Sequence, residues 1–376
     1  MKRIRVLHCL ETIGSGGVEQ TRLSLVKRLD PKRYEQKIVC TQAIGGLPKY
    51  FEEFGCSIHP VGVFNGISDR RPYQNTLKII QEFRPDVVHG AVYEGVALAT
   101  VAGRLGRVPV IIGEETSDPQ NRSLKGSLLF RAITAFTHHM VAVSPAVEIY
   151  LRKGIKLPER KVTMIANGVA EKVKPKPELV SYVRDFLSIK PSDLVIGTVG
   201  RLLDEHKRVS DLIRSLPLIL EHFQNAKLLV VGSGPDEDEL KALSIELGVR
   251  DKIFFTGYQV DTRLYYEIMD VFAIASAHEA FGLVLVEAMF AGVPVVATRT
   301  GGIPKVVLEN ETALLVSTFA PKEIAAAIVK LLGDFDRARA MGEKGRVRAR
   351  KYFSEERYVS DVDNLYTRLL NERGLI

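Results

Sequence analysis

Two carboxylates in the C-terminal half of the chain have a spacing that suits a ligand with vicinal hydroxyl groups. Glu279 and Glu287 are eight residues apart. Ser276 ends an apolar run of the strand type, and apolar residues then recur at helical spacing, which predicts a helix that begins at Gly282 or Leu283. Glu279 is then expected in the loop and Glu287 on the helix. Carboxylates accept hydrogen bonds from hydroxyls, so one acid on each side of a bound diphosphate suits a nucleotide sugar.

The predicted helix start between these two acids is suited to a phosphate group. The first N–H groups of a helix have no partner within it, and the positive end of the helix dipole lies there. A simpler alternative is a surface helix that carries two acids and binds nothing.

Two cations lie in a second expected loop. The apolar run at residues 194–199 ends at Gly200, and Arg201 and Lys207 follow, six residues apart. Open α/β sheets bind ligands beyond the carboxyl ends of their strands, where these side chains can converge and neutralise a leaving diphosphate. Solvated surface charges are the alternative, which is stronger for Lys207 alone than for the pair beside Gly200.

Glycine-rich segments support a phosphate ligand and weaken two rival functions. Residues 14–17 (Gly-Ser-Gly-Gly) follow the first apolar run and lead into a helix, although a flexible turn has the same pattern. Gly232 and Gly234 supply two glycines of a dinucleotide fingerprint, but the third is missing and Pro235 follows at once. No G-x-x-x-x-G-K-[ST] segment occurs. A nicotinamide dehydrogenase and a P-loop enzyme are therefore not supported.

These residues require a scaffold of parallel strands, and the pattern of the chain predicts one. Apolar runs alternate with amphipathic helical stretches, which is typical of α/β domains with parallel sheets. A chain of 376 residues is too long for one ordinary core, and 46% hydrophobic and 26% charged residues suit two globular domains. The expected strands are residues 4–10, 36–41, 86–90, 108–112, 140–143 and 162–165, then 194–199, 227–231, 253–255, 271–275, 293–297 and 313–316.

A polar, proline-broken segment at residues 172–177 is the expected linker. We expect residues 1–180 to form an N-terminal Rossmann-like domain and residues 185–354 a C-terminal one. Apolar and aromatic residues recur at helical spacing near the end of the chain, so a helix at about 355–376 is expected to pack back on the first domain.

Charge is distributed unevenly between the two halves. Residues 1–170 hold 24 Lys and Arg against 15 Asp and Glu, whereas residues 171–376 hold 28 against 30. The first half is therefore expected to face a negative partner, such as anionic phospholipid or a lipid-diphosphate acceptor. Nucleic acid is not expected as a partner, because no helix-turn-helix, RNP-like or zinc-finger pattern occurs.

The chain is expected to be cytoplasmic. The basic start precedes too short an apolar run for a signal peptide, and no window approaches the ~18 apolar residues of a membrane span. Cys9, Cys40 and Cys56 lack paired or metal-ligand spacing, which indicates reduced, buried thiols.

A basic amphipathic stretch suggests peripheral contact with the inner face of a membrane. Arg122, Lys125 and Arg131 interleave with apolar residues between positions 124 and 136. Such a helix can lie on an anionic leaflet. The alternative is a helix that packs on the core and leaves a charged edge in water.

Taken in order along the chain, these segments resemble family 4 of the retaining glycosyltransferases, which have the GT-B fold. The resemblance spans nearly the whole chain and implies two Rossmann-like domains that face a central cleft, with the donor held mostly by the C-terminal one. The Glu279 segment, with Arg201 and Lys207, is the specific part. The matching segments are Gly16-Gly17-Val18-Glu19, Pro85 to His89, Val143-Ser144-Pro145, Asn167-Gly168-Val169, Gly200-Arg201-Leu202 with Lys207, Glu279 to Glu287, and Gly301-Gly302-Ile303-Pro304.

The resemblance implies a role for each matching residue. Arg201 and Lys207 would stabilise the leaving diphosphate, and Glu279 would hold hydroxyls of the donor sugar. Glu287 would bind the ribose, and Tyr258 would contact the base. Neither a metal ion nor another cofactor is implied. The other donor-binding residues would be Gly16 and Gly17, the backbone of Phe281, Gly282 and Leu283, and Gly301 and Gly302.

The sequence departs from the family pattern at two positions. Glu115 stands where the family often has a histidine, so it is a candidate catalytic residue that would accept a hydrogen bond from a sugar hydroxyl or the proton of the acceptor. An ordinary loop carboxylate is the alternative. Lys305 stands where an acid is common, and its side chain would either add positive charge near the donor or point to solvent.

The expected function is transfer of a hexose-type sugar, with retention, from a nucleotide-sugar donor to a glycan or lipid-linked acceptor in surface polysaccharide or glycolipid synthesis. A nucleotide-sugar epimerase of similar fold is the first alternative, and it would convert the donor without an acceptor. A catalytically silent relative that binds nucleotide sugar is the second alternative.

Overall fold

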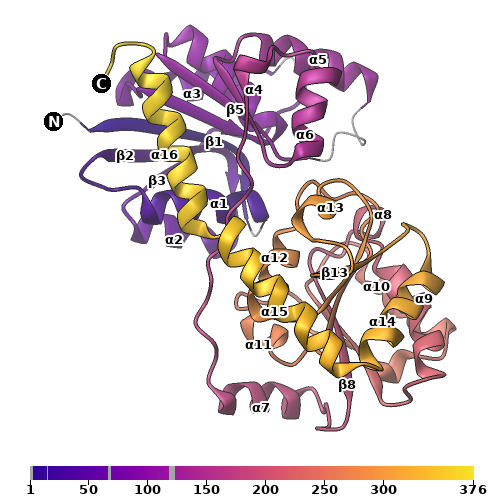
Figure 1. The fold of residues 1–376 in the computed structure, drawn as a ribbon. Coiled ribbons are helices and arrows are strands. Elements are labelled where there is room, and N and C mark those ends of the chain that lie inside the picture. Colours follow the sequence, from indigo (N-terminus) through magenta and orange to yellow (C-terminus); the bar gives the residue numbers. More distant parts are fainter. Residues whose placement is uncertain (1–2, 15, 67–68, 118–122) are drawn as a thin grey trace. The chain divides into compact units, whose positions relative to one another are not determined.

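The computed structural model describes residues 3–14, 16–66, 69–117 and 123–376, which fold as two compact units. The first unit contains Met1–Ala170 and Glu355–Ile376, and the second contains Glu171–Ser354. Each unit is built on one parallel β-sheet that helices cover on its faces (Figure 1). The prediction of two Rossmann-like α/β domains is therefore confirmed.

The sheet of the first unit contains, in chain order, β1 (Ile4–Ile13), β2 (Tyr34–Ala43), β3 (Ser57–Pro60), β4 (Val87–Ala91), β5 (Val110–Glu115), β6 (His139–Ala142) and β7 (Val162–Met164). In space, the order of the described strands is β3-β2-β1-β4-β5-β6-β7, so the direction of progression reverses between β1 and β4. Strand β3 was not predicted, because it is a short edge strand that is only partly buried and lacks an apolar run.

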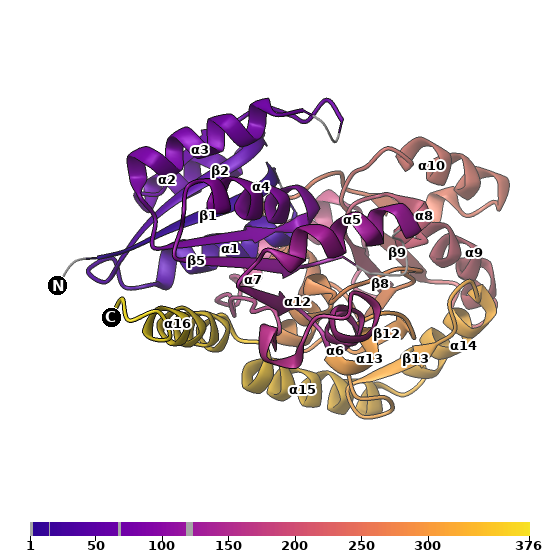
Figure 2. The same cartoon turned by 90° about the horizontal axis from the view of Figure 1, so that it is seen from above.

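Two pairs of helices cover opposite faces of this sheet. Helices α1 (Gly17–Arg28) and α16 (Glu355–Asn371) share a buried cluster with alternate strand residues such as Val6. Helices α3 (Arg71–Phe83) and α4 (Val92–Leu105) share another cluster, which includes Leu7. Successive strand residues point to opposite faces, and Figure 2 shows α3 and α16 on opposite sides of the sheet. The unit also contains α2 (Leu47–Glu53), α5 (Leu124–Ala135), α6 (Pro145–Ile149), the π-helix η2 (Tyr150–Gly154) and the 3-10 helix η3 (Glu159–Lys161).

The sheet of the second unit contains β8 (Leu194–Val199), β9 (Ala226–Val231), β10 (Ile253–Phe255), β11 (Val271–Ile274), β12 (Val295–Thr298) and β13 (Ala313–Val316). The spatial order of the described strands is β10-β9-β8-β11-β12-β13, which places the point of reversal between β8 and β11. Each of these strands overlaps a strand that the apolar runs predicted.

The helices of the second unit also form two packed pairs. Helices α9 (Val209–Leu220) and α14 (Pro321–Leu332) pack together over a buried cluster that includes Val271 and Ala273. Helix α12 (Leu283–Ala291) packs against α15 (Phe335–Tyr352). The remaining helices are α7 (Pro177–Phe186), α8 (Asp204–Lys207), α10 (Glu237–Glu246), the 3-10 helix η4 (Arg250–Lys252), α11 (Arg263–Tyr266) and α13 (Ile303–Val306).

The first unit ends at Ala170, earlier than the predicted limit of residue 180. The segment that follows is tied to the second unit by specific contacts. Lys174 forms an ion pair with Glu267 at 3.2 Å, and Arg263 donates to the carbonyl of Val173 at 3.2 Å. Helix α7 then contacts α11. The proline-broken segment therefore belongs to the second unit, whereas the sequence placed it at the end of a first domain of residues 1–180.

The described residues contain no helix with both the length and the apolarity needed to cross a membrane. Cys9, Cys40 and Cys56 are buried and free, and burial raises the pKa of each thiol.

Candidate functional site

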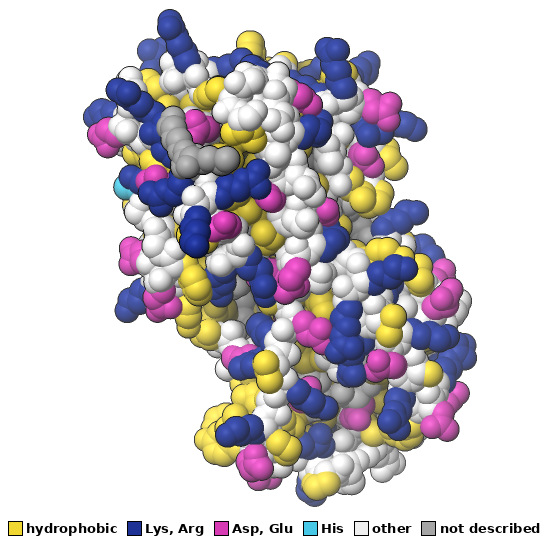
Figure 3. Space-filling model, turned by 60° about the vertical axis from the view of Figure 1, so that its left-hand side comes forward, with side chains coloured by type: hydrophobic (Ala, Val, Ile, Leu, Met, Phe, Trp, Pro, Cys, Tyr) yellow, Lys and Arg dark blue, Asp and Glu magenta, His cyan; other side chains and the backbone are white. Residues whose placement is uncertain are grey.

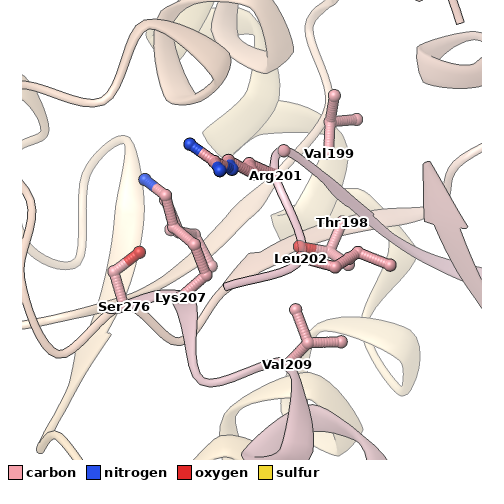
Figure 4. A pocket seen from close by; sticks show the side chains of 9 residues that line it. Thr198, Val199, Arg201, Leu202, Lys207, Val209 and Ser276 are labelled. Carbon is pink, nitrogen blue, oxygen red and sulfur yellow. The ribbon is translucent and has the colours of Figure 1, made fainter. Parts of the chain in front are cut away.

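A pocket lies at the point where the strand order of the second sheet reverses. Strands β8 and β11 are neighbours there, and their connections leave in opposite directions, so the loops after them part and leave a crevice. The lining comes from the ends of both strands and from the segment after β8 (Figure 4). The lining residues are Thr198, Val199, Gly200, Arg201, Leu202, Lys207, Val209, Ile274 and Ser276.

Lys207 connects the two loops that the sequence singled out. Its Nζ atom donates to Oε2 of Glu279 at 2.6 Å, and the two side chains are 31% and 12% exposed. Figure 4 shows Lys207 and Arg201 with their nitrogen-bearing ends on the same side of the pocket. Two cations and a carboxylate from separate segments therefore meet at one place, and solvent or a ligand can reach them.

Backbone contacts also tie the Lys207 segment to the Glu279 loop. The N–H of Ala277 donates to the carbonyl of His206 at 2.8 Å. The rings of His206 and His278 meet edge to face, with their centroids 5.7 Å apart. The position of Lys207 relative to Glu279 therefore depends on the backbone as well as on the ion pair.

Ser276 is a pocket residue that the sequence analysis treated only as the end of a strand. It is fully buried, and its Oγ atom has no hydrogen-bond partner among the described residues. Its carbonyl accepts a hydrogen bond from Thr298 Oγ1 at 2.6 Å, which fixes the backbone. A buried hydroxyl needs a partner, so Ser276 is suited to donate to a ligand. Its signal in the sequence was a lone hydroxyl at the carboxyl end of an apolar strand.

Glycines allow the segments around Glu279 to approach closely. Gly302 donates its N–H to the carbonyl of Glu279 at 2.8 Å, and a Cβ atom on Gly302 would lie 2.1 Å from the carbonyl oxygen of Ala280. Gly282 precedes α12 in the left-handed region, with φ 89°, which favours glycine. The structure thus brings Gly301 and Gly302 to the loop that contains Phe281, Gly282 and Leu283. Lys305 is exposed.

Glu287 lies on α12, where its carboxylate faces residues of the α11 region. Its Oε2 atom accepts hydrogen bonds from the hydroxyl of Tyr266 at 3.0 Å and from Thr262 Oγ1 at 3.3 Å. Burial raises the pKa of the Glu287 carboxyl, although Lys172 and the two hydroxyls oppose this shift. The two donors orient the carboxylate, and Oε1 has no protein donor within the described chain.

Gly232 and Gly234 have a packing role that explains their incomplete dinucleotide pattern. A Cβ atom on Gly232 would lie 1.9 Å from the carbonyl oxygen of Gly200, and one on Gly234 would lie 2.2 Å from that of Leu202. Gly232 also donates its N–H to the carbonyl of Gly257 at 2.9 Å. The loops after β8, β9 and β10 are therefore joined. Tyr258, which is 55% exposed, follows directly.

Two arginines of α15 hold the far ends of the helices that begin in this region. Arg346 donates to the carbonyl of Ala291 at 2.9 Å, at the end of α12. Arg348 donates to the carbonyls of Val306 and Lys305, each at 2.7 Å, at the end of α13. Cations at these ends satisfy free carbonyls and complement the negative ends of the helix dipoles.

The glycine turn of the first unit leads into α1, as expected. Gly16 is the N-cap residue and, like Gly17, is exposed, while Ser15 lies outside the described residues. A Cβ atom on Gly16 would lie 2.4 Å from a carboxylate oxygen of Glu19. Burial raises the pKa of Glu19, and the N–H groups of Gly14 and Gly16 oppose this shift. The N–H groups of the turn therefore face an anion, which is the carboxylate of the protein itself.

Glu115 ends β5 and is buried. Its Oε1 atom accepts a hydrogen bond from the N–H of Ser117 at 3.0 Å and another from the hydroxyl of the same residue. These bonds fix the turn that leaves the strand, as a loop carboxylate does. A catalytic role for Glu115 stays a prediction.

A buried polar cluster in the first unit was not identified from the sequence. Arg22 pairs with Glu114 at 2.7 Å, and both side chains are almost fully buried. His89 contacts Glu114 through Nε2 at 3.3 Å and the hydroxyl of Tyr366 through Nδ1 at 2.7 Å, and Arg22 lies 3.3 Å from each ring nitrogen. Burial and the nearby Arg22 lower the pKa of His89 to about 4. Burial raises the pKa of Glu114, but Arg22 outweighs it and holds the value at about 2.

The amphipathic stretch forms α5, and its outer face is both apolar and basic. Leu128 and Phe136 are 67% and 61% exposed, and Lys125 and Arg131 are exposed beside them. Phe130 faces the core. Arg122, the third predicted basic residue, lies outside the described residues. In Figure 3, Lys and Arg side chains stand beside apolar ones over much of the visible surface.

The chain is similar to known glycosyltransferases along both units. Residues 15–172 match the family model for Glycosyltransferase Family 4, and residues 183–348 match the model for Glycosyl transferases group 1. The chain is 26% identical to N-acetyl-alpha-D-glucosaminyl L-malate synthase of Bacillus anthracis, over 97% of this chain and 96% of that protein. It is 28% identical to the lipopolysaccharide core biosynthesis glycosyltransferase LpsD of Rhizobium meliloti, over 95% and 97% of the two chains.

A solved structure shares the fold across the whole chain. Anabaena Alr3699/HepE in complex with UDP-glucose has a TM-score of 0.87 and 20% identity, over 97% of this chain and 100% of that one. The two family models together cover both units. The chain therefore belongs to the family 4 type of GT-B glycosyltransferases.

Proposed function

We propose that this glycosyltransferase moves a hexose-type sugar, with retention at the anomeric carbon, from a nucleotide sugar to a glycan or lipid-linked acceptor. The product would be a surface polysaccharide or glycolipid. The observation that carries the proposal is the meeting of Arg201, Lys207 and Glu279 at the carboxyl ends of β8 and β11. A relative acts in lipopolysaccharide core synthesis, which supports the proposed class of acceptor. The Anabaena structure holds UDP-glucose, which supports the proposed class of donor.

The reaction is favoured by positive charge at the position where the leaving group departs. When the bond between the anomeric carbon and the diphosphate breaks, negative charge develops on the nucleoside diphosphate. Arg201 and Lys207 would stabilise that charge, and the Ser276 hydroxyl would donate to a phosphate oxygen. Glu279 would keep Lys207 in place and accept hydrogen bonds from hydroxyls of the sugar.

The phosphates, ribose and base of the donor would lie against residues of the second unit beyond this pocket. Backbone N–H groups at the start of α12, from Phe281 to Leu283, would face the phosphates. Glu287, oriented by Tyr266 and Thr262, would accept hydrogen bonds from the ribose through Oε1. Tyr258 would contact the base. Gly16 and Gly17 of the first unit would offer their N–H groups to the diphosphate in place of Glu19, and Glu115 would face the acceptor.

The first test is a thermal-shift panel with UDP, GDP and ADP and their common sugar conjugates. A ligand that binds only the folded state raises the unfolding midpoint. We expect a clear shift with one nucleotide, which identifies the carrier. No shift with any of them would contradict the donor site and would favour a catalytically silent relative.

We propose that the reaction needs no divalent ion, because two cations already line the pocket. Turnover is expected to be unchanged in excess EDTA. Retention is tested by the NMR coupling of the anomeric proton in the first product formed. An inverted product would contradict the assigned stereochemistry without affecting the donor site.

We also propose that α5 brings the enzyme to an anionic membrane surface, where a lipid-linked acceptor would be found. Exposed Leu128 and Phe136 would enter the headgroup region while Lys125 and Arg131 meet anionic lipid. Co-sedimentation is expected with vesicles that contain phosphatidylglycerol and not with neutral vesicles. Leu128→Ser and Arg131→Ser should each weaken it. Equal recovery with both kinds of vesicle would contradict surface binding.

A further inference from the structure

Arg208, the residue directly after Lys207, adopts an unusual backbone conformation. Helix α8 ends at Lys207 and α9 begins at Val209, so Arg208 is the single residue between the two helices. Its backbone is left-handed, with φ 51° and ψ 42°. This region is disfavoured for residues that carry a Cβ atom, and such residues persist there only when their surroundings hold them.

Four side-chain contacts hold Arg208 in this conformation. Its guanidinium donates to both carboxylate oxygens of Asp211, at 2.9 and 3.0 Å, and Asp211 is buried. It also reaches Asp204 at 3.5 Å, and it lies 5.0 Å from the ring centroid of Phe319. The bidentate pair requires the planar guanidinium, whereas any cation can lie over an aromatic ring. We call Arg208, Asp204, Asp211 and Phe319 the Arg208 clamp.

The carboxylate of Asp204 extends the clamp to the backbone of α9. Its Oδ1 atom accepts a hydrogen bond from the N–H of Ser210 at 2.8 Å, and its own N–H donates to Asp236 at 2.5 Å. The clamp therefore fixes the turn between α8 and α9 from both sides and joins it to the loop after β9.

None of the four clamp residues is among the residues that line the pocket. Lys207 and Val209 line the pocket, whereas Arg208 does not. Two carboxylates surround the guanidinium and more than offset its single positive charge. Arg208 therefore has little electrostatic effect on a diphosphate, although its left-handed backbone fixes how α8, which ends at Lys207, is joined to α9.

We infer that Arg208 is a positioning residue, whose clamp holds Lys207 where it can contact the leaving diphosphate. This inference rests on the proposed role of Lys207. If it holds, loss of the guanidinium should weaken diphosphate binding only while Lys207 is present, because Arg208 acts through that side chain.

The test is a double-mutant cycle read by calorimetry. The probe is the member of UDP, GDP and ADP that gives the largest thermal shift. Arg208→Gly keeps the left-handed backbone accessible and removes the clamp, so the fold should persist. We expect Lys207→Ala to weaken binding about tenfold or more, Arg208→Gly about fivefold, and the double variant no more than Lys207→Ala alone.

Two further variants separate positioning from charge and from general stability. Arg208→Lys keeps the charge and should bind as weakly as Arg208→Gly, since it cannot form the bidentate pair. Asp211→Asn loosens the clamp from its other side and should weaken binding in the same direction. Recovery of full affinity in Arg208→Lys would overturn positioning in favour of simple attraction.

The outcomes distinguish the inference from the proposed function. Additive losses in the double variant would overturn the inference and leave the donor site intact. An unchanged affinity in Lys207→Ala would contradict the assigned role of Lys207, and the inference with it. A chain that binds none of the three nucleotides would overturn both.

Discussion

Arg22 and Arg201 both come after the first strand of their sheets: Arg22 lies in α1, the helix after β1, and Arg201 lies in the loop after β8. Arg22 is fully buried, pairs with Glu114 and contacts His89, which in turn binds Tyr366 of α16. Arg201 is exposed and lines a pocket with Lys207. The same strand order thus supports two uses of charge. In the first unit, Glu114 neutralises the charge of Arg22, and the cluster they form binds Tyr366 of α16. In the second unit, the charges of Arg201 and Lys207 remain accessible to a ligand.

An arginine in the segment after a first strand therefore does not by itself mark a ligand site. The two arginines differ in their own exposure and in the burial of the ion pair beside them. The carboxylate of Glu114 is committed to buried partners, whereas Glu279 and Lys207 are both partly exposed. Removal of one partner should therefore affect stability in the first unit and ligand binding in the second.

The largest expected effect is on stability in the first unit. Glu114→Ala leaves the Arg22 charge buried and unpaired, which should cost about 3–5 kcal/mol of unfolding free energy. Urea unfolding measures this. The matched double variant Arg22→Met with Glu114→Leu should recover most of the loss, because it removes both charges. If Glu114→Ala unfolds at the wild-type urea concentration, the structural assignment of this pair is wrong.

The matched change in the second unit should affect turnover instead. Lys207→Ala should lower kcat by about 10²–10³-fold and change the donor KM far less, since the charge it stabilises develops in the transition state. Its urea midpoint should stay near the wild type, because a partly exposed pair contributes about 0–1 kcal/mol. Lost donor binding with normal turnover at saturation would contradict this assignment.

Acid should weaken the first unit through its buried histidines. The folded pKa of His89 is about 4, below its unfolded value, so the unfolded chain binds protons more readily. Stability should therefore fall as the pH drops from about 6.5 towards 4, by about 2 kcal/mol between pH 7 and pH 5. His8, whose pKa burial also lowers, contributes with the same sign. Urea unfolding at each pH should show a shallower dependence in His89→Gln; an equal dependence would exclude His89 as a source.

The smallest expected effect separates stability from ribose binding at Glu287. Burial raises its pKa, so the ionised carboxylate destabilises the fold at pH values above that pKa. Glu287→Gln should be equally or slightly more stable, and the difference should grow as the pH rises above the ordinary carboxyl range. Nucleotide affinity should fall about tenfold. A less stable variant with unchanged affinity would mean that Glu287 only accepts the hydrogen bonds of Tyr266 and Thr262 and does not bind the ribose.

The residues proposed to bind the donor could be located from the sequence because each belongs to a short segment with its own pattern. Glu279 and Glu287 flank one strand-loop-helix junction, and Arg201 follows a strand whose limits the apolar run gave correctly. Their meeting follows from a rule of topology, since loops at the carboxyl ends of adjacent parallel strands converge.

The missed features depend on contacts between distant segments. The Arg22 cluster draws its members from α1, β4, β5 and α16, and no spacing in the sequence connects them. The sequence gives no sign of the left-handed backbone at Arg208, because that residue is not a glycine. Strand β3 lacks an apolar run because an edge strand is only partly buried, and the linker joined the second unit through contacts that its proline-rich composition does not reveal.

We propose that the pocket between the ends of β8 and β11 binds the nucleoside diphosphate of the donor. Hydrogen exchange measured by mass spectrometry, with and without the nucleotide that gives the largest thermal shift, tests it directly. We expect slower exchange in residues 199–208 and 276–304 of the wild type, and little slowing there in the double variant Arg201→Ala with Lys207→Ala. Protection confined to other segments, with these two unchanged, would contradict it.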